Sequence, residues 1–232
     1  MRTLIAVPSV PALVAACGDN PPPSTGDSPA APAPAENPAA APAPIPEKAK
    51  QAEASGWRGI ASAADAANLG RLDEAWRLAR AEAEDKGFAS QVEALGPLVD
   101  PNAGQAGRLQ PSPGTYRCRT VKLGAKAEGG LAYVAYPFFR CTVELTPGGD
   151  LVLTKTTGSQ RTRGLLYPDT DRRLVFIGAQ AWGADETGFP AYGAQSERDQ
   201  VGVFERIGPE RWRMVVPWPR VESKLEILEL AR

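Results

Sequence analysis

The stretch Thr115-Tyr-Arg-Cys-Arg-Thr-Val121 decides the fold of the chain, because apolar and charged side chains alternate along it. Tyr116 and Cys118 lie on one side of an extended chain, and the arginines that follow them lie on the other. The same period of two returns in Phe139–Leu145. Such alternation predicts two strands, each with one buried face and one exposed face.

Six further segments read as strands: Leu151–Thr156, Gly164–Tyr167, Arg173–Gln180, Gln200–Ile207, Arg211–Val216 and Lys224–Leu230. Turn signals rich in Gly, Pro and Asp separate them. Short connections make neighbouring strands antiparallel. We therefore expect residues 115–232 to form an antiparallel β domain of about eight strands. A closed barrel is favoured, and a sandwich is the alternative.

A helical segment precedes the strands. In Ser62–Lys86, apolar residues recur at steps of three and four, with Trp76 as the expected core anchor. The serine at its start approximates a capping box, and Gly87 suits its end. A shorter helix is expected over Ala89–Leu95. Residues 48–114 are thus predicted to contribute a helical hairpin and a loop, so that the fold class is α+β.

Residues 1–17 are expected to be a lipoprotein signal peptide. A short apolar stretch with a basic residue in front of it ends in Val-Ala-Ala-Cys17, which resembles the bacterial lipobox. The resemblance implies cleavage before Cys17 and lipid on its thiol and new amino group, which would anchor the chain to a membrane. An ordinary signal peptide and a buried apolar strand are the alternatives. Gly18 rather than Asp follows the cysteine, which favours the outer membrane over the inner one.

Residues 18–47 are expected to be a disordered tether. They contain ten Pro, eight Ala and no aromatic residue, so they cannot bury enough apolar surface to offset chain entropy. A proline-rich chain favours the extended polyproline II conformation, at about 3.1 Å per residue. A tether of this kind would hold a folded domain away from the membrane, on the periplasmic side of the cell envelope.

Composition excludes several kinds of site. The chain has 232 residues and a formal net charge of −1, so it has no global basic field that would attract nucleic acid. It has no His, which excludes catalytic triads and metal sites that need this residue. Asp169 and Asp171 form a D-x-D pattern that reads as a turn rather than a calcium loop. We expect no metal, no cofactor other than the lipid, and no enzymatic activity.

Cys118 and Cys141 are expected to form a disulfide. Both fall on the apolar side of their strands, and a two-residue turn at Gly129-Gly130 would place them directly opposite each other. Export would bring them into an oxidising compartment. A reactive thiol is the alternative, but neither cysteine lies in a C-x-x-C motif or at an expected helix N-terminus.

Four arginines are the candidate for an anion-binding patch. Arg161 and Arg163 lie near a strand start, and Arg172 and Arg173 follow across the turn at Pro168. Antiparallel pairing would bring the four together, where they could bind lipid phosphate, a glycan acid or an acidic partner. The alternative is a solvated hairpin with alternating charges. Arg117, Arg119 and Arg140 have similar outward positions.

Several stretches together resemble an uncharacterised bacterial family, domain of unknown function 4893. They are Gly114–Gly124, Tyr136-Pro-Phe-Phe-Arg-Cys141, Thr154–Arg161, Glu197-Arg-Asp199, Phe204–Pro209, Arg211-Trp-Arg213 and Glu222-Ser223. The resemblance implies an exported bacterial protein and supplies no catalytic or binding residues. The order of a Gly-x-Tyr first strand and a late Phe-Glu-Arg strand is also similar to calycin-type barrels, which include small bacterial protease inhibitors.

Three functions remain open at this point. The first is a non-enzymatic interaction module, tethered to a membrane, that contacts another envelope component. The second is a lipocalin-like carrier of a small apolar ligand, which needs a hollow barrel; a protease-inhibitor-like barrel is a related alternative. The third is a hydrolase that uses Ser, Lys or carboxylates. The missing catalytic groups and the long tether favour the first. Oligomeric state is left open.

Overall fold

The computed structural model describes residues 56–232, and the expected signal peptide with Cys17 and the tether lie outside this range. The helical elements are a 3₁₀ turn, three α-helices, a π turn and a second 3₁₀ turn: Gly56–Gly59, α2 (Ala63–Gly70), α3 (Leu72–Ala83), Glu84–Phe88, α4 (Ala89–Glu93) and Gly96–Leu98. Among residues 56–232, no helix combines the length and the apolar character that crossing a membrane requires.

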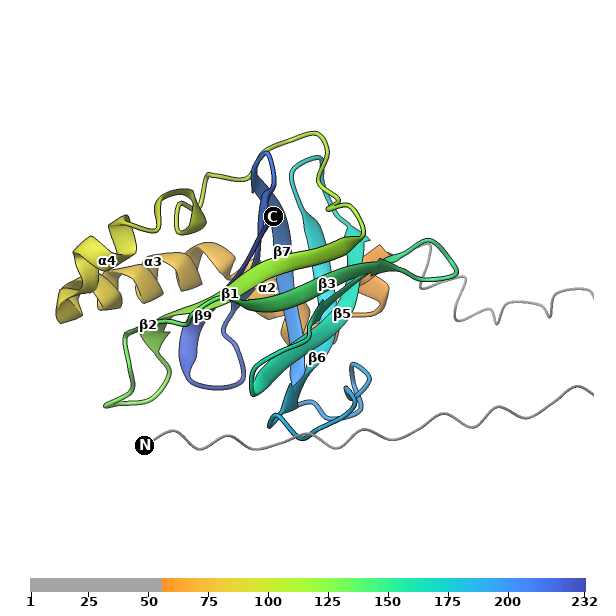
Figure 1. Cartoon of the computed structure of the whole chain (residues 1–232). Helices are drawn as coiled ribbons and strands as arrows, with labels where there is room; N and C mark the ends of the chain where they lie inside the picture. Colours follow the sequence, from red (N-terminus) through yellow and green to blue (C-terminus); the bar gives the residue numbers. More distant parts are fainter. Residues whose placement is uncertain (1–55) are drawn as a thin grey trace, which may run out of the picture. The chain divides into compact units, whose positions relative to one another are not determined.

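Nine antiparallel strands follow: β1 (Gly114–Ala125), β2 (Tyr133–Ala135), β3 (Phe139–Leu145), β4 (Leu151–Lys155), β5 (Gln160–Pro168), β6 (Leu174–Trp182), β7 (Asp199–Gly208), β8 (Arg211–Pro217) and β9 (Ser223–Ala231). Each strand from β3 to β8 pairs with the next one along the chain. β9 pairs with β1, and β1 also pairs with β3. Eight strands therefore close into a barrel, and β2 is an extra strand on β1 (Figure 1). The predicted α+β fold with an antiparallel barrel is confirmed, and the closure agrees with the calycin-like resemblance.

The helical segment is broken where one long helix was predicted. Ser62 caps α2 as expected, because its Oγ accepts a hydrogen bond from the backbone N–H of Asp65 at 3.1 Å. The helix then ends at Gly70, and Arg71 leaves the helical conformation with φ −106° and ψ 22° before α3 starts. Gly70 weakens the helix at this point. After α3, Gly87 has φ 90° and breaks the helical conformation inside the turn Glu84–Phe88, at the position where the sequence predicts the end of the helix.

The helices cover part of the outer wall of the barrel, beside β1 and β9 (Figure 1). Trp76 is 4% exposed and packs in a cluster with outward-facing apolar residues of β1 and β6–β9. The helix comes very close to the sheet at Gly124, which has φ 66°, since a Cβ there would lie 2.8 Å from Cα of Ala79. The helical segment thus packs against the outside of the barrel wall.

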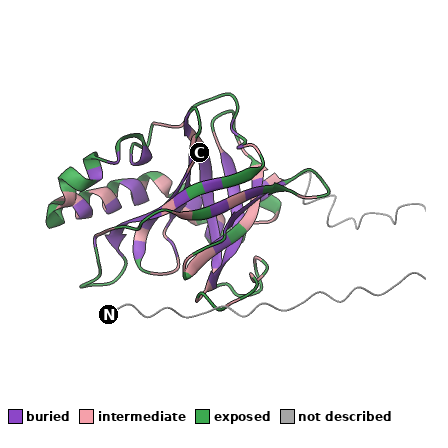
Figure 2. Ribbon diagram, viewed as in Figure 1, coloured by how far each residue is buried: buried purple, intermediate pink, exposed green. Residues whose placement is uncertain are grey.

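A second apolar cluster fills much of the barrel interior. Phe176, Phe204 and Met214 are fully buried in it, and they come from neighbouring strands. Buried residues accordingly line the inward faces of the strands as well as the faces under the helices (Figure 2). The barrel therefore has one core inside it and one core between its wall and the helices.

The predicted disulfide is confirmed, but the predicted register is wrong. Cys118 and Cys141 are bonded, with Cα atoms 5.8 Å apart. Their direct partners in the β1–β3 ladder are different residues, Phe139 for Cys118 and Tyr116 for Cys141. The turn is longer than two residues, and the chain passes through β2 and the segment 136–138 before β3 begins. The two cysteines are consequently diagonal neighbours.

Candidate functional site

The inside of the barrel has an apolar half and a polar half. The polar half consists of buried residues at inward positions of the strands: Lys122, Lys155, Thr162, Gln180, Gln200 and Glu226. Oγ1 of Thr162 and Oε1 of Gln200 have no hydrogen-bond partner in the part of the chain that the structure describes. Since most buried polar atoms in proteins are hydrogen-bonded, these two atoms leave unused hydrogen-bonding capacity in the polar half.

Lys122 is the centre of an ion-pair network at the polar end. Its side chain is 3% exposed, and its Nζ lies 3.6 Å from Oε2 of Glu226, its direct partner on β9. Nζ also contacts the carboxylate of Glu222 and donates a hydrogen bond to Oε1 of Gln160 at 2.7 Å. Burial disfavours the charge on Lys122, but the two carboxylates outweigh burial and raise its pKa above the usual value.

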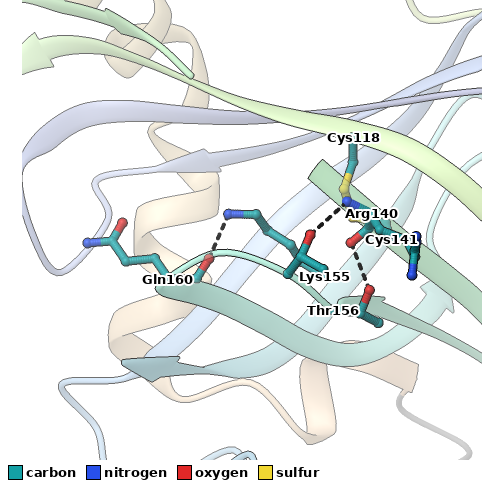
Figure 3. The surroundings of a disulfide bond; sticks show 7 residues. Cys118, Arg140, Cys141, Lys155, Thr156 and Gln160 are labelled. Carbon is teal, nitrogen blue, oxygen red and sulfur yellow. Dashed lines mark hydrogen bonds between the residues drawn. A yellow bond between two sulfur atoms is a disulfide. The ribbon is translucent and has the colours of Figure 1, made fainter. Parts of the chain in front are cut away.

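Lys155 lies beside this network and makes fewer polar contacts. It is 6% exposed and lies on β4, and its direct ladder partner is Cys141 on β3. Its Nζ donates to the backbone oxygen of Gln160 at 2.7 Å (Figure 3). The same nitrogen lies 4.5 Å from the centroid of the Phe139 ring. Within residues 56–232, no carboxylate comes within ion-pair distance of Lys155.

Burial and the neighbouring charges together set the pKa of Lys155. Burial is the main reason that the pKa of Lys155 lies below its usual value. Attraction to Glu226 counteracts burial, whereas repulsion from Lys122 and Arg161 lowers the pKa further. Lys155 is thus a buried amine whose positive charge is poorly matched by its surroundings.

The turn between β8 and β9 brings Glu222, a residue with a strained backbone, next to Lys122. Glu222 has φ 68°, and the backbone N–H of Lys126 donates to its backbone oxygen at 3.0 Å. Its carboxylate accepts a hydrogen bond from Nε2 of Gln160 at 3.0 Å. The pKa of Glu222 lies below its usual value, chiefly because of the hydrogen bond from Lys122. Non-glycine residues held at positive φ cost about 1–3 kcal/mol and are frequent at functional sites.

Three hollows adjoin one another along β1 and the segment after it. We name them the mouth cleft, about 220 Å³, the hairpin groove, about 480 Å³, and the arginine groove, about 680 Å³. The mouth cleft is lined by Thr120, Tyr136, Phe139, Lys155, Ser159, Gln160 and Glu222. It shares Tyr136 and Glu222 with the hairpin groove, and it shares Phe139 with the arginine groove.

The arginine groove collects positive charge over an aromatic floor. Arg117 and Arg140 are exposed and lie directly opposite each other in the β1–β3 ladder. The Cζ of Arg117 lies 4.7 Å from the centroid of Phe138, a ring that is 41% exposed. Arg232 is the third arginine of the lining, which contains no Asp or Glu. The groove therefore presents three guanidinium groups and no side-chain carboxylate.

A family model described as Domain of unknown function (DUF4893) matches residues 57–230. The chain belongs to this family. The match extends from the first helical turn into the last residues of β9, so it covers nearly all of the described domain. The resemblance seen in the sequence is thereby confirmed. No curated protein and no solved structure matches the chain.

The four arginines that were expected to form one patch lie apart in the DUF4893 domain. Arg161 and Arg163 lie near the start of β5, whereas Arg172 and Arg173 lie in the turn at its other end. About seven residues of strand, roughly 20 Å, separate the two pairs. The expectation of a single patch is wrong because β5 begins at Gln160, several residues before the predicted start.

Each of these arginines has its own surroundings in the domain. Arg161 donates to the backbone oxygen of Gly183 at 3.2 Å. Arg163 approaches Oγ1 of Thr154 at 3.4 Å, Arg173 binds Oδ2 of Asp169 at 2.7 Å, and Arg172 is exposed. Asp169 also accepts from Nε1 of Trp57 at 2.8 Å, so its turn is structural as expected. Residues 56–232 contain no group of three or more Cys, Asp and Glu side chains placed to hold a metal ion.

Sequence reasoning missed Lys122, Lys155 and Glu222 as site residues. A signal for Lys122 was present, because it continues the inward side of β1 after Tyr116 and Cys118. A lysine on the buried side of a strand is unusual, since lysines are rarely buried unless paired. No comparable signal marks Glu222, which reaches the site only because the β8–β9 turn lies beside β1 in the closed DUF4893 barrel.

Proposed function

We propose that the protein is a membrane-tethered lipoprotein of the bacterial envelope and acts as a non-enzymatic interaction module. In this proposal, lipid on Cys17 anchors the chain, the outer membrane is favoured, and residues 18–47 hold the domain at a distance on the periplasmic side. The domain then binds an acidic segment of another envelope protein in its arginine groove. The lipobox pattern and the proline-rich tether support the first part, and the groove supports the second.

The like-charged pair of Arg117 and Arg140 carries the proposal. Like charges directly opposite in a ladder destabilise a sheet by a few tenths of a kcal/mol or more. Neither guanidinium has a carboxylate or a hydrogen-bond acceptor as partner within residues 56–232. Arg119, the next outward residue of β1, is by contrast paired with Glu229 at 2.6 Å. A bound carboxylate would relieve the repulsion and could accept bidentate hydrogen bonds.

The composition of the groove favours a protein segment as partner. Arginine and aromatic residues dominate the energetic centres of protein interfaces, and an exposed Phe138 beside Arg117 has this character. The lining combines three arginines with Phe138 and Phe139, so it can contact both the carboxylates and the apolar side chains of one peptide. We therefore assign the groove to an acidic segment with apolar residues between its carboxylates.

A carrier of an apolar ligand inside the barrel receives less support. Such a carrier needs free volume between apolar side chains. In this barrel, Phe176, Phe204 and Met214 fill the apolar half and are completely buried. The remaining half is polar, so it suits a different ligand.

A defined peptide can test the groove directly. The probe is a fluorescein-labelled peptide of alternating Glu and Leu, and fluorescence anisotropy measures its binding to the full chain. We expect binding that weakens as salt is added, because exposed charges are screened. The double variant Arg117→Gln/Arg140→Gln should lose most of the affinity. Arg172→Gln removes an equally exposed arginine in the β5–β6 turn and should bind like the wild type.

The outcome in cells decides whether the groove meets such a partner. A photo-crosslinking amino acid is placed at Phe138 in one strain and at Arg172 in another. The proposal requires a Phe138-specific adduct whose partner carries an acidic segment at the crosslinked site. The same adducts at both positions, or equal peptide binding by the double variant, would refute it. Binding of the wild type to anionic lipid vesicles but not to the peptide would instead assign the groove to a membrane.

A further inference from the structure

The mouth cleft contains a buried ammonium group with unused hydrogen-bonding capacity. A lysine ammonium has three N–H donors. Nζ of Lys155 uses one of them on the backbone oxygen of Gln160 at 2.7 Å, and it has no other acceptor within residues 56–232. The Phe139 ring is its other close neighbour, at 4.5 Å. A charge that is 6% exposed and poorly paired is costly to bury, so a negatively charged ligand would relieve a real penalty.

The neighbouring groups do not supply this missing charge. The carboxylates of Glu226 and Glu222 are both engaged by Lys122, and Gln160 donates to Glu222 as well. Lys122 is therefore paired with both carboxylates, whereas Lys155 has no carboxylate within ion-pair distance among residues 56–232. The asymmetry between the two lysines places one unmatched cation at the wall of the cleft.

The opposite wall of the cleft is held in a fixed position. Glu222 keeps its place at φ 68° although this conformation is unfavourable for a residue with a side chain. Lys126 fastens the turn, because its Nζ donates to the backbone oxygen of Pro219 at 2.7 Å and its backbone N–H donates to Glu222. Gln160 bridges the two walls, as its side chain binds Glu222 and its backbone oxygen binds Lys155. A cleft supported in this way is largely preformed.

We propose that the mouth cleft binds the carboxylate of a small organic acid, with Nζ of Lys155 as the charged contact. The volume of about 220 Å³ admits only a small molecule. Tyr136 and Phe139 line the cleft and offer an apolar surface to the rest of the ligand. Glu222 lines it too, so a singly charged carboxylate is accepted more readily than a doubly charged phosphate. The site shares Phe139 with the arginine groove but is lined by none of its arginines, so it does not depend on the function proposed for that groove.

Nuclear magnetic resonance of the lysines tests this site. The chain contains seven lysines, so ¹³C-lysine labelling of the full chain gives a simple spectrum of ε-methylene signals. The signal of Lys155 is assigned by its absence in Lys155→Met. Sodium acetate is the probe, and sodium chloride at equal ionic strength is the control. We expect the Lys155 signal to shift saturably with acetate and not with chloride, while exposed lysines such as Lys86 do not respond.

Variants separate a binding role from a structural one. Lys155→Arg keeps the charge and should retain an acetate response in the Gln160 side-chain amide, whereas Lys155→Met should lose it while it still unfolds cooperatively. Lys86→Met is the matched control and should behave as the wild type. An unmoved Lys155 signal, or a drift shared by all lysines, would overturn the proposal. A stronger response to inorganic phosphate would overturn the assignment to a carboxylate.

The same experiment distinguishes this site from the arginine groove. Arg117→Gln/Arg140→Gln changes no residue that lines the mouth cleft. The acetate response of Lys155 should persist in this double variant even though its binding of the acidic peptide is lost. If the double variant loses both the acetate response of Lys155 and the binding of the acidic peptide, the two assays report on one site. That result would refute the proposal that the mouth cleft binds acetate independently of the arginine groove.

Discussion

Cys118 is joined to Cys141 along a diagonal of the β1–β3 ladder, with Cα atoms 5.8 Å apart. Cys141 is also the direct ladder partner of Lys155 on β4. The disulfide therefore fastens β1 to β3 at the boundary between the apolar half of the barrel and its polar half. It supports the strands that carry Arg140 on the outside and Lys155 on the inside.

Loss of the disulfide should destabilise the domain without changing its fold. The two cysteines are 23 residues apart, and closing a loop of this length in the unfolded chain is worth about 3 kcal/mol. We expect Cys118→Ala/Cys141→Ala to lower the free energy of unfolding by about that amount in urea titrations. Reductant should lower the stability of the wild type in the same way and leave the double variant unchanged. Equal stability of the two proteins would contradict this account.

The strands were predictable because each of them repeats a clear pattern, whereas their register was not. Phe139–Leu145 was predicted with the bounds that it has in the structure, since its apolar and polar residues alternate strictly. Tyr133–Ala135 is too short to show a period, so β2 was missed. The ladder partner of each residue changes with every residue that the connection adds. The register of β1 with β2 differs from its register with β3, and the sequence does not reveal this shift at residues 136–138.

Arg213 should be far more important for stability than a surface arginine. Its side chain is fully buried, its Nη2 lies 2.7 Å from Oε2 of Glu205, and it donates to the backbone oxygens of Leu98 and Asp100 at 3.0 and 2.7 Å. Arg213→Met leaves these acceptors without a donor, so we expect a loss of about 3–5 kcal/mol in the free energy of unfolding.

A matched surface pair provides the control for Arg213. Arg71 binds Glu74 at 2.8 Å with both side chains well exposed. Arg71→Met should change the free energy of unfolding far less than Arg213→Met does, because exposed ion pairs contribute little to stability. Urea titrations of both variants measure the difference. Similar decreases in the free energy of unfolding for the two variants would show that burial does not determine how much these contacts stabilise the domain.

Asp169 should make the stability of the domain depend on pH in the acidic range. Burial alone would raise its pKa, but hydrogen bonds from Trp57 and Arg173 and the charge of Arg58 outweigh burial and hold the pKa below 3.8. The stabilisation is therefore present above pH 3.8 and is lost as the pH falls through the lower value of the folded state.

Asp169→Asn isolates this contribution. At neutral pH we expect the variant to be less stable by about 2 kcal/mol, the typical worth of hydrogen bonds to a charged group. The difference should shrink as the pH is lowered below 3.8, because the wild-type carboxyl is then neutral too. Denaturant titrations of both proteins across this range measure it. A gap that stays constant with pH would assign the loss to packing rather than to charge.

The candidate binding site was less accessible to prediction than the fold. Lys122 could be placed inside the barrel from its position in the alternation of β1. Its partners could not, because Glu222 and Gln160 lie 100 and 38 residues away in the chain and meet it only after the barrel closes. The like-charged pair of Arg117 and Arg140 depends on the β1–β3 register, which the sequence did not reveal.

Lys155 should lower the stability of the domain at neutral pH. Its pKa is lower in the folded state than the usual value of 10.5, chiefly because of burial. The unfolded chain therefore binds more protons than the folded one between the two values, and stability rises with pH across that window. At pH values below this window, the folded state bears the full free-energy cost of burying the charge of Lys155. Above pH 10.5 the lysine is neutral in both states and this cost is gone.

Replacing Lys155 by methionine should accordingly stabilise the protein. We expect Lys155→Met to raise the free energy of unfolding by about 1 kcal/mol at neutral pH, as when buried charges are exchanged for apolar groups of similar size. The advantage over the wild type should shrink as the pH rises towards 10.5. Lys86→Met, at an exposed helical position, should stay within about 0.5 kcal/mol of the wild type at every pH. Saturating acetate should narrow the gap at neutral pH by stabilising only the protein that keeps Lys155. Residues kept for binding commonly reduce stability, so their replacement stabilises a protein. If Lys155→Met is instead less stable than the wild type, the lysine is a structural contact and not a binding residue.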